Sequence, residues 1–519
     1  MTSTTDRLES PSPATSIVTT GLMLFALFFG AGNLIFPPLL GAASGGSLPM
    51  VMIGFLVTGV LLPLATIVAV STSGEGILGL ARRVGPRFGA VMPLAVYLSI
   101  GPFYAVPRVT TVAYELATLP VLELLGIHNS SWAQAAHVAV FLGISILIAL
   151  RPSRLADSIG RWLTPALLLL LAVLCGATIL TAPGLERSAI EPYASAPMTT
   201  GLTQGYLTMD VLSASVFGIV VISSLRERGF TAPGRLVRGT TIAGGIAAVL
   251  LGAVYVGLAL IGTRSPGDVT SETTEGTELL RSAASLTLGR GGVIVFAGIV
   301  VLACLTTAVG LLASWAGYAY TAWPAVSFNR QLAAGTLVSF VLANLGLKAI
   351  LKITAPLLFL LYPLAICLVV VTLVDALAPG RLRSAYLWPV GVAGVLGLVS
   401  ALTEAGWTTP SDLLSRTGLW DNSTGWIVPA LIALGIGLAR PEIAAAQAKD
   451  YAEMYEPREE RRVGESRGAD SDVAMFGHYL SNNTGIGLRV VAGGALLGIG
   501  VFVALILNGW LFGIVSAHM

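Results

Sequence analysis

Residues 25–41 read FALFFGAGNLIFPPLLG, and this stretch decides how the rest of the chain can be arranged. It lies inside an apolar run, 17–40, that is long enough to cross a bilayer core of ~30 Å. Its middle is nevertheless poor helix material, because glycine and asparagine weaken a helix and proline removes a backbone donor. The residues concerned are Gly30, Gly32, Asn33, Pro37 and Pro38.

Backbone groups freed by a helix break need partners inside a membrane, so such breaks are tolerated only where they are buried in protein or line a cavity. Secondary transporters use broken helices to bind ions and charged substrate groups. The stretch therefore predicts a discontinuous membrane helix at a ligand site. A kink that only eases helix packing is the alternative.

The composition is that of a polytopic helical membrane protein. Of 519 residues, 55% are hydrophobic and 11% are charged, and the mean hydropathy is +0.83. A net charge of +2 does not indicate a nucleic-acid partner. Cys175, Cys304 and Cys367 lie in apolar runs without a Cys-x-x-Cys spacing, so we expect neither disulfides nor zinc.

Apolar runs predict the membrane helices directly. They lie at about 17–40, 47–71, 89–118, 133–150, 161–181, 202–224, 237–262, 291–322, 331–346, 353–375, 386–404 and 424–439, with a thirteenth at 489–515. Arginine-rich loops after the second, fourth, sixth and tenth helices place the N-terminus in the cytoplasm.

The predicted organisation has two halves of five helices each. Since each half contains an odd number of helices, the second half is inverted relative to the first. The sixth helix opens the second half and is interrupted by polar residues at 208–215. The expected divisions are a cytoplasmic tail at 1–16, repeats at 17–181 and 202–375, two helices at 386–439, a flexible cytoplasmic linker at 440–488 and a further membrane helix at 489–515.

Four segments carry a family resemblance. They are FFGAGNLIFPP (28–38), GPFYAVPRVTTVAYE (101–115), GYLTMDVLSASVFG (205–218) and LACLTTAVGL (302–311). Together they resemble the bacterial branched-chain amino acid:cation symporters of the amino acid–polyamine–cation superfamily, over about residues 17–440. The resemblance implies an all-α, leucine-transporter-like fold, with a 5+5 inverted repeat and discontinuous first and sixth helices.

Two adjacent threonines, Thr306 and Thr307, lie in an apolar helix. A single membrane threonine usually bonds to its own helix, which is the alternative for either residue. The resemblance implies that this pair, the Ala303 carbonyl and first-helix carbonyls near Ala26 and Phe29 bind Na⁺ as a coupling ion. No other cofactor is expected.

An amino acid substrate presents a carboxylate and an ammonium group, which suit the two ends of broken helices. We expect the carboxylate near the first break, the ammonium near 209–213, and an aliphatic side chain in an apolar pocket. Asn33 has two alternatives, a second cation site and a structural amide. The expected substrate residues are Gly30, Ala31, Gly32, Asn33, Tyr104, Asp210, Val211, Ser213 and Phe217.

Three charged residues lie inside apolar runs: Arg108, Glu115 and Asp210. Such charges are costly in a membrane and usually pair with one another. Arg108 and Glu115 share a helix face but are too far apart for a tight pair. We therefore expect Arg108 to pair with Asp210 as a gate or a static brace. Proton coupling through Glu115 or Asp210 is an alternative.

These observations predict a sodium-driven symporter that imports leucine, isoleucine and valine across a bacterial plasma membrane by alternating access. A proton-coupled or differently selective transporter of the same fold is the alternative. A membrane enzyme or a channel is a different class. No acidic or histidine constellation indicates an enzyme, and no obligate protein partner is evident.

Overall fold

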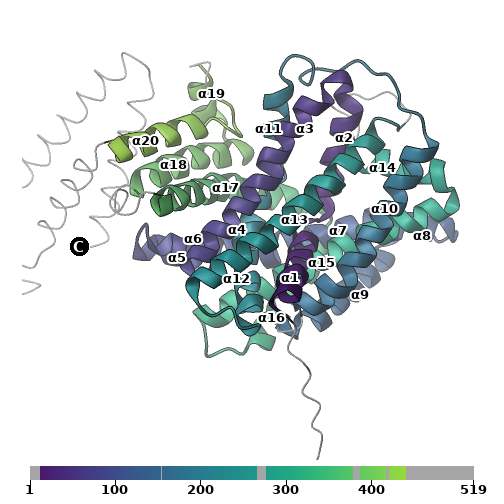
Figure 1. Ribbon diagram of the computed structural model, residues 1–519. Helices are drawn as coiled ribbons and strands as arrows, with labels where there is room; N and C mark the ends of the chain where they lie inside the picture. The colour runs from purple at the N-terminus through teal and green to yellow at the C-terminus, as the bar shows by residue number, and fades with distance from the viewer. Residues whose placement is uncertain (1–11, 153–154, 266–275, 378–385, 417–419, 440–519) are drawn as a thin grey trace, which may run out of the picture. The chain divides into compact units, whose positions relative to one another are not determined.

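The computed structural model describes residues 12–152, 155–265, 276–377, 386–416 and 420–439 (Figure 1). Every regular element in these ranges is helical. Eight of the helices are long and apolar enough to cross a membrane, and two bent helix pairs would raise the number to ten. The all-α polytopic fold is therefore confirmed. The predicted linker at 440–488 and helix at 489–515 lie outside the described residues.

The chain divides into two units, 1–373 and 374–519. The first half of the first unit contains α1 (Pro13–Phe28), η1 (Ala31–Leu34), α2 (Phe36–Ala43), η2 (Gly45–Ser47), α3 (Leu48–Leu56), η3 (Val57–Leu61), α4 (Leu62–Ser73), α5 (Ile77–Arg82), α6 (Pro86–Leu98), η4 (Ser99–Phe103), α7 (Ala105–Ala113), η5 (Tyr114–Thr118), α8 (Leu119–Leu124), α9 (Ser131–Ala149), η7 (Ala156–Leu163) and α10 (Thr164–Thr181).

The second half contains α11 (Pro197–Leu207), α12 (Asp210–Glu227), α13 (Pro233–Gly262), α14 (Gly276–Leu288), α15 (Arg290–Ala322), α16 (Phe328–Ala343) and α17 (Leu347–Leu377), the last of which crosses the boundary between the units. The second unit contains α18 (Leu387–Glu404), α19 (Thr409–Ser415) and α20 (Ile427–Ala439). These bounds follow the predicted membrane helices closely, whereas α14 lies where no helix is predicted.

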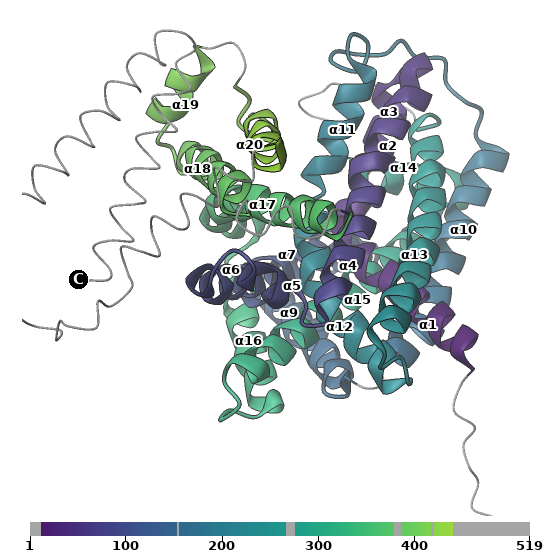
Figure 2. The same cartoon turned by 60° about the vertical axis from the view of Figure 1, so that its left-hand side comes forward.

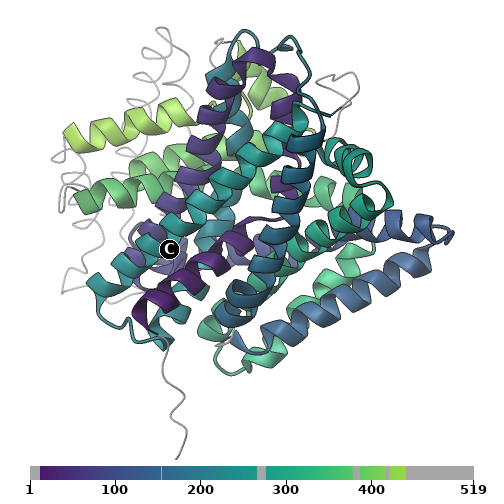
Figure 3. The same ribbon diagram turned by 45° about the vertical axis from the view of Figure 1, so that its right-hand side comes forward.

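The first membrane helix is broken, as predicted. α1 ends at Phe28, Gly30 is extended (φ −99°, ψ −172°), and the chain resumes as η1 and α2 after a bend of 80°. Pro37 and Pro38 lie in the first turn of α2, where a missing N–H costs nothing because that turn has no acceptor for it. Both α1 and α2 pack against α13 (Figures 2 and 3).

The sixth membrane helix is also broken, with a bend of 45° between α11 and α12. Met209 lies between the two helices in the left-handed region (φ 58°, ψ 23°). This conformation is unfavourable for a residue with a side chain, so surrounding packing must hold it. The polar interruption that predicted this break thus coincides with a strained backbone.

A third interruption was not predicted. The sequence favours one helix over 89–118, but the structure has a π-helical segment at Ser99–Phe103, in which Gly101 is non-helical (φ −86°, ψ −113°). Pro102 follows and cannot donate a helical hydrogen bond. The interruption ends at Tyr104, directly before α7.

Glycines allow several helices to approach closely. A Cβ on Gly201 in α11 would lie 2.0 Å from the backbone oxygen of Val51 in α3. A Cβ on Gly41 in α2 would lie 1.8 Å from the backbone oxygen of Ala259 in α13. Small residues of this kind are how membrane helices pack tightly, because apolar side chains gain little from leaving lipid. One half of each broken helix, α2 or α11, is therefore held closely against a neighbouring helix, α13 or α3.

We expect Gly201→Ala to destabilise the protein, because the added methyl group would have to displace the α3 backbone. Overpacking of this kind costs about 1–3 kcal/mol and should lower the melting temperature by about 1–3 °C in a chain of this length. Thermal unfolding of the purified protein in detergent measures the change. Gly245→Ala in α13 is the control, since its Cβ would meet nothing within 4 Å. Equal melting temperatures for the two variants would contradict the prediction.

Candidate substrate and cation site

Two hydroxyls of α15 reach the end of α1. Thr306 Oγ1 lies 2.9 Å from the Ala26 oxygen, and Thr307 Oγ1 lies 3.1 Å from the Leu27 oxygen. Thr306 Oγ1 also lies 3.1 Å from the Ala303 oxygen in its own helix. The last carbonyls of a helix have no N–H partner within it. The break in α1 thus leaves carbonyl oxygens without helical partners, and the two threonine hydroxyl oxygens of α15 lie beside them.

The chemistry of this cluster suits a hard cation. Its members are neutral oxygens, and the two hydroxyls carry two protons for a larger number of carbonyl lone pairs. Thr306 is fully buried and Thr307 nearly so. The end of a helix is also the negative end of its dipole. Four of the predicted sodium residues, Ala26, Ala303, Thr306 and Thr307, are therefore brought together.

Phe29, the fifth predicted sodium residue, follows the last helical residue of α1. Its ring is buried and stacks on Phe25, with the centroids 5.5 Å apart, and it approaches Tyr255 at 6.3 Å. Gly30 follows, and a Cβ on it would lie 3.1 Å from Thr307 Oγ1. The threonine pair thus contacts both the carbonyls at the end of α1 and the first residue of the unwound segment.

Asn33 connects the two broken helices. Its amide nitrogen donates to the Phe28 oxygen at 2.7 Å and to Asp210 Oδ2 at 3.3 Å. Asn33 and Asp210 are 2% and 6% exposed, so both bonds are protected from water. The first bond satisfies a carbonyl freed by the break, which is the structural role considered for this amide. The second bond links the first break to the start of α12.

Arg108 occupies the other side of the unwound segment. Its Nη1 donates to the Tyr104 hydroxyl at 2.6 Å, and its guanidinium lies 5.4 Å from the centre of the Tyr104 ring. A Cβ on Gly32 would lie 3.8 Å from Arg108 Nη2. The predicted Arg108–Asp210 ion pair is not formed in this structure, because the guanidinium bonds to Tyr104 and the carboxylate to Asn33. A helix predicted as continuous over 89–118 is interrupted directly before these two residues, so their rotation about the helix axis could not be read from the sequence.

The remaining predicted residues have different surroundings. Phe217 is fully buried on α12, where it meets Phe28 edge-on with the centroids 5.9 Å apart. Val211 is buried in the first turn of α12, and Ser213 is partly exposed. Ala31 lies in η1, between Gly30 and Gly32. Glu115 has an exposed side chain in η5, one segment beyond α7.

Two tyrosines beside Asp210 were missed by the sequence analysis. Tyr255 on α13 and Tyr362 on α17 are 0% and 1% exposed, and both lie near the Asp210 carboxylate. The Tyr362 hydroxyl is close to the Val211 backbone, whereas the Tyr255 hydroxyl has no hydrogen-bond partner among the described residues. Nothing local marks these tyrosines, because each stands alone in an apolar run. Only the packing of their helices brings them to the α12 start.

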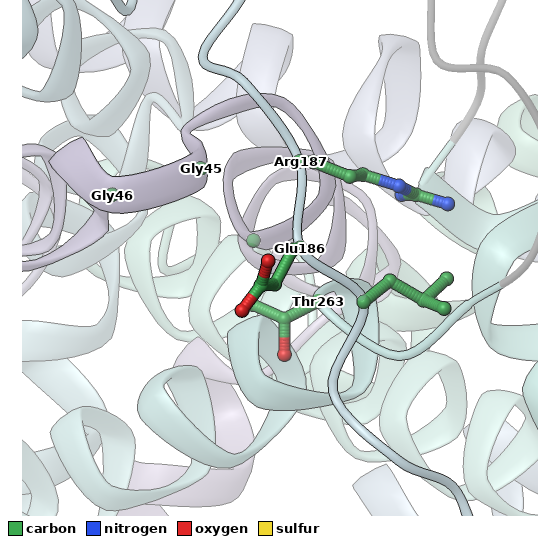
Figure 4. A pocket seen from close by; sticks show the side chains of 7 residues that line it. Gly45, Gly46, Glu186, Arg187 and Thr263 are labelled. Carbon is green, nitrogen blue, oxygen red and sulfur yellow. The ribbon is translucent and has the colours of Figure 1, made fainter.

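A separate cavity of about 270 Å³ lies where η2 meets the loop before α11 and the end of α13 (Figure 4). None of the predicted substrate or sodium residues lines it. Its lining residues are Gly41, Gly45, Gly46, Leu185, Glu186, Arg187 and Thr263.

Comparison with known proteins places this arrangement in a family. Residues 13–443 match the family model described as branched-chain amino acid transport protein. The chain belongs to this family. It is a membrane transporter and not an enzyme. Residues 423–519 separately match the model described as stage II sporulation protein M.

Curated relatives are similar to the transporter over most of its length. The branched-chain amino acid permease BrnQ of Corynebacterium glutamicum is 38% identical over 424 residues, covering 82% of this chain and 95% of the relative. The branched-chain amino acid transport system 2 carrier protein of Pseudomonas aeruginosa is 38% identical over 418 residues, covering 80% and 93%. The permease BraB of Bacillus subtilis is 35% identical over 428 residues, covering 82% and 95%.

Among solved structures, the transporter resembles Mhp1, a nucleobase-cation-symport-1 family transporter in a closed conformation with bromovinylhydantoin bound. The TM-score is 0.53 and the sequences are 15% identical, with 83% of this chain and 93% of the other covered. This likeness confirms the leucine-transporter-like fold and does not bear on the substrate.

Proposed function

We propose that the transporter imports leucine, isoleucine and valine across the bacterial plasma membrane, driven by symport of Na⁺. The N-terminus is then cytoplasmic, and alternating access comes from movement of the broken helices against the rest. The observation that carries the proposal is the meeting of Thr306 and Thr307 with the last carbonyls of α1. The names of the curated relatives support the substrate class.

Sodium and substrate would be coupled through the unwound segment they share. Na⁺ would take the carbonyl oxygens of Ala26 and Ala303 and the two threonine hydroxyls, with their protons turned away. The segment from Ala26 to Asn33 would then be held at one end by the ion and at the other by the substrate. Two ligands that order the same segment each lower the cost of binding the other, which is the coupling that symport requires.

The substrate side chain would lie among Phe217, Tyr104 and Val211. An apolar pocket discriminates by only ~1–3 kcal/mol per methylene. Leucine, isoleucine and valine should therefore compete with one another, whereas charged amino acids should not compete.

Uptake of labelled leucine into proteoliposomes tests the proposal. We expect an inward sodium gradient to raise initial uptake at least about fivefold over an equal potassium gradient, because coupling between two binding sites typically amounts to ~1–3 kcal/mol, which is about 5- to 150-fold. Excess isoleucine or valine should abolish the signal and excess lysine should not. Uptake that is equal in both gradients would refute sodium coupling.

Proton symport is the second candidate, favoured by the buried Asp210 carboxylate, which bonds to a neutral amide instead of a cation. A pH gradient imposed without sodium separates the two candidates. Leucine accumulation driven by this gradient and abolished by a protonophore would establish proton coupling in place of sodium coupling.

A further inference from the structure

The unwound segment at the first break lies beside both a cation and an anion. Arg108 Nη2 faces Gly32, and Asp210 accepts a hydrogen bond from Asn33. Gly32 and Asn33 are adjacent residues, so the two charges lie near one another without forming an ion pair. Two charges placed in this way suit a small molecule that carries one charge of each sign.

Arg108 forms no salt bridge within the described residues; its hydrogen bond goes to the neutral Tyr104 hydroxyl, and the Asp210 carboxylate attracts it without direct contact. A cation inside a membrane protein is costly when no anion contacts it. Tyr104 fixes one arm of the guanidinium fork by a hydrogen bond and supports its plane by the ring. The other arm is left directed at the glycine-rich segment, and an arginine fork is well shaped for a carboxylate.

The opposite side carries acceptors for a positive group. The Asp210 carboxylate is accompanied by the buried Tyr255 and Tyr362 hydroxyls, of which that of Tyr255 has no hydrogen-bond partner among the described residues. Hydroxyls buried in this way cost free energy unless something bonds to them. An ammonium group brings three donors and would be met here by one carboxylate oxygen and a tyrosine oxygen.

We propose that Arg108 binds the substrate carboxylate and that Asp210 receives the substrate ammonium group, so that the amino acid bridges the two charges. This inference rests on the proposed function and adds the residues that recognise the charged ends of the substrate. Arg108 is then a binding residue, held in place by Tyr104, and not half of an ion pair. The backbone N–H groups at the start of η1 would assist it, since the first N–H groups of a helix lack internal acceptors.

Binding of leucine and two analogues to the purified full-length protein in sodium tests the proposal. Leucinamide keeps the ammonium group and lacks the carboxylate charge, whereas 4-methylpentanoate keeps the carboxylate and lacks the ammonium group. The wild-type protein should bind leucine at least about tenfold more tightly than either analogue, since a charge-assisted contact contributes ~1.5–3 kcal/mol, which is about 10- to 150-fold in affinity.

In Arg108→Gln, the preference for leucine over leucinamide should fall to within about threefold, while the preference over 4-methylpentanoate remains. In Asp210→Asn, the reverse should hold. Arg235→Gln is the matched control, because Arg235 also stacks on an aromatic ring, Phe230, and is not part of the site. Its preferences should equal those of the wild type.

Sodium binding measured without substrate shows whether a variant has lost recognition of the substrate or has lost its fold. Arg108→Gln should keep the wild-type sodium affinity and melting temperature. An unchanged leucine-to-leucinamide ratio in Arg108→Gln would overturn the assignment. So would loss of sodium binding together with leucine binding, in both Arg108→Gln and Arg108→Lys, since this would show a structural role. Failure of leucine to bind the wild-type protein would instead refute the proposed function.

Discussion

Replacing both Thr306 and Thr307 with alanine should raise the sodium concentration that gives half-maximal leucine uptake by about 100-fold or more. Each hydroxyl lies against a carbonyl at the end of α1, and both are buried. A contact between a polar group and a charge contributes ~1.5–3 kcal/mol, so two lost ligands cost ~3–6 kcal/mol of sodium binding. The measurement is the sodium concentration that gives half-maximal uptake in proteoliposomes.

The controls separate the loss of ligand oxygens from a change in packing. The double serine variant keeps both hydroxyls and should stay close to the wild type. Thr241→Ala removes a threonine of α13 whose hydroxyl bonds only to its own helix and whose side chain is exposed. It should leave the sodium dependence unchanged. Full sodium-stimulated uptake by the double alanine variant would show that the ion binds elsewhere.

Replacing Asn33 with alanine should lower the kcat/KM of leucine uptake by about 100-fold, because one side chain makes two buried bonds at the break. The bond to the Asp210 carboxylate contributes ~1.5–3 kcal/mol and the bond to the Phe28 carbonyl ~0.5–1.5 kcal/mol. Both partners would be left buried and unsatisfied. Initial rates over a range of leucine concentrations, at saturating sodium, measure the effect.

A double-mutant cycle shows whether Asn33 acts through Asp210. The Asn33→Ala/Asp210→Asn variant should lose little more than the worse single variant, because the shared bond can be lost only once. Asn344→Ala is the control, since this exposed amide bonds only to the preceding turn of its own helix. Strictly additive losses would mean that the two residues act independently.

The sequence predicted the breaks because they depend on local chemistry. Gly30, Gly32 and Asn33 are weak helix formers, and the following prolines favour the start of a new helix. The second break follows from polar residues around Asp210 in an apolar run. The helix ranges agree with the structure because membrane length is read from composition alone. The sodium residues came from the family resemblance, and the structure brings four of them together.

The features that were missed depend on packing between distant segments. The interruption at Gly101 and Pro102 was missed because apolar residues on both sides continue the helical run. α14 was missed because it is shorter than a membrane span and only one side of it, around Leu279 and Ala283, is buried. The period of the hydrophobic pattern and the composition do not distinguish the Gly101 interruption from ordinary helix, or α14 from a loop.

The sequence by itself determined that this chain is a membrane transporter with two broken helices. It also predicted a pair of threonines beside the break in the first of them. Only the tertiary structure decided the partners of the charged residues. Asn33 and Asp210 are 177 positions apart, and the sequence predicted a bond from Arg108 to Asp210 instead. The physical reason is that a side chain's partner depends on how each helix is rotated and kinked against its neighbours, which is set by the packing of the whole bundle.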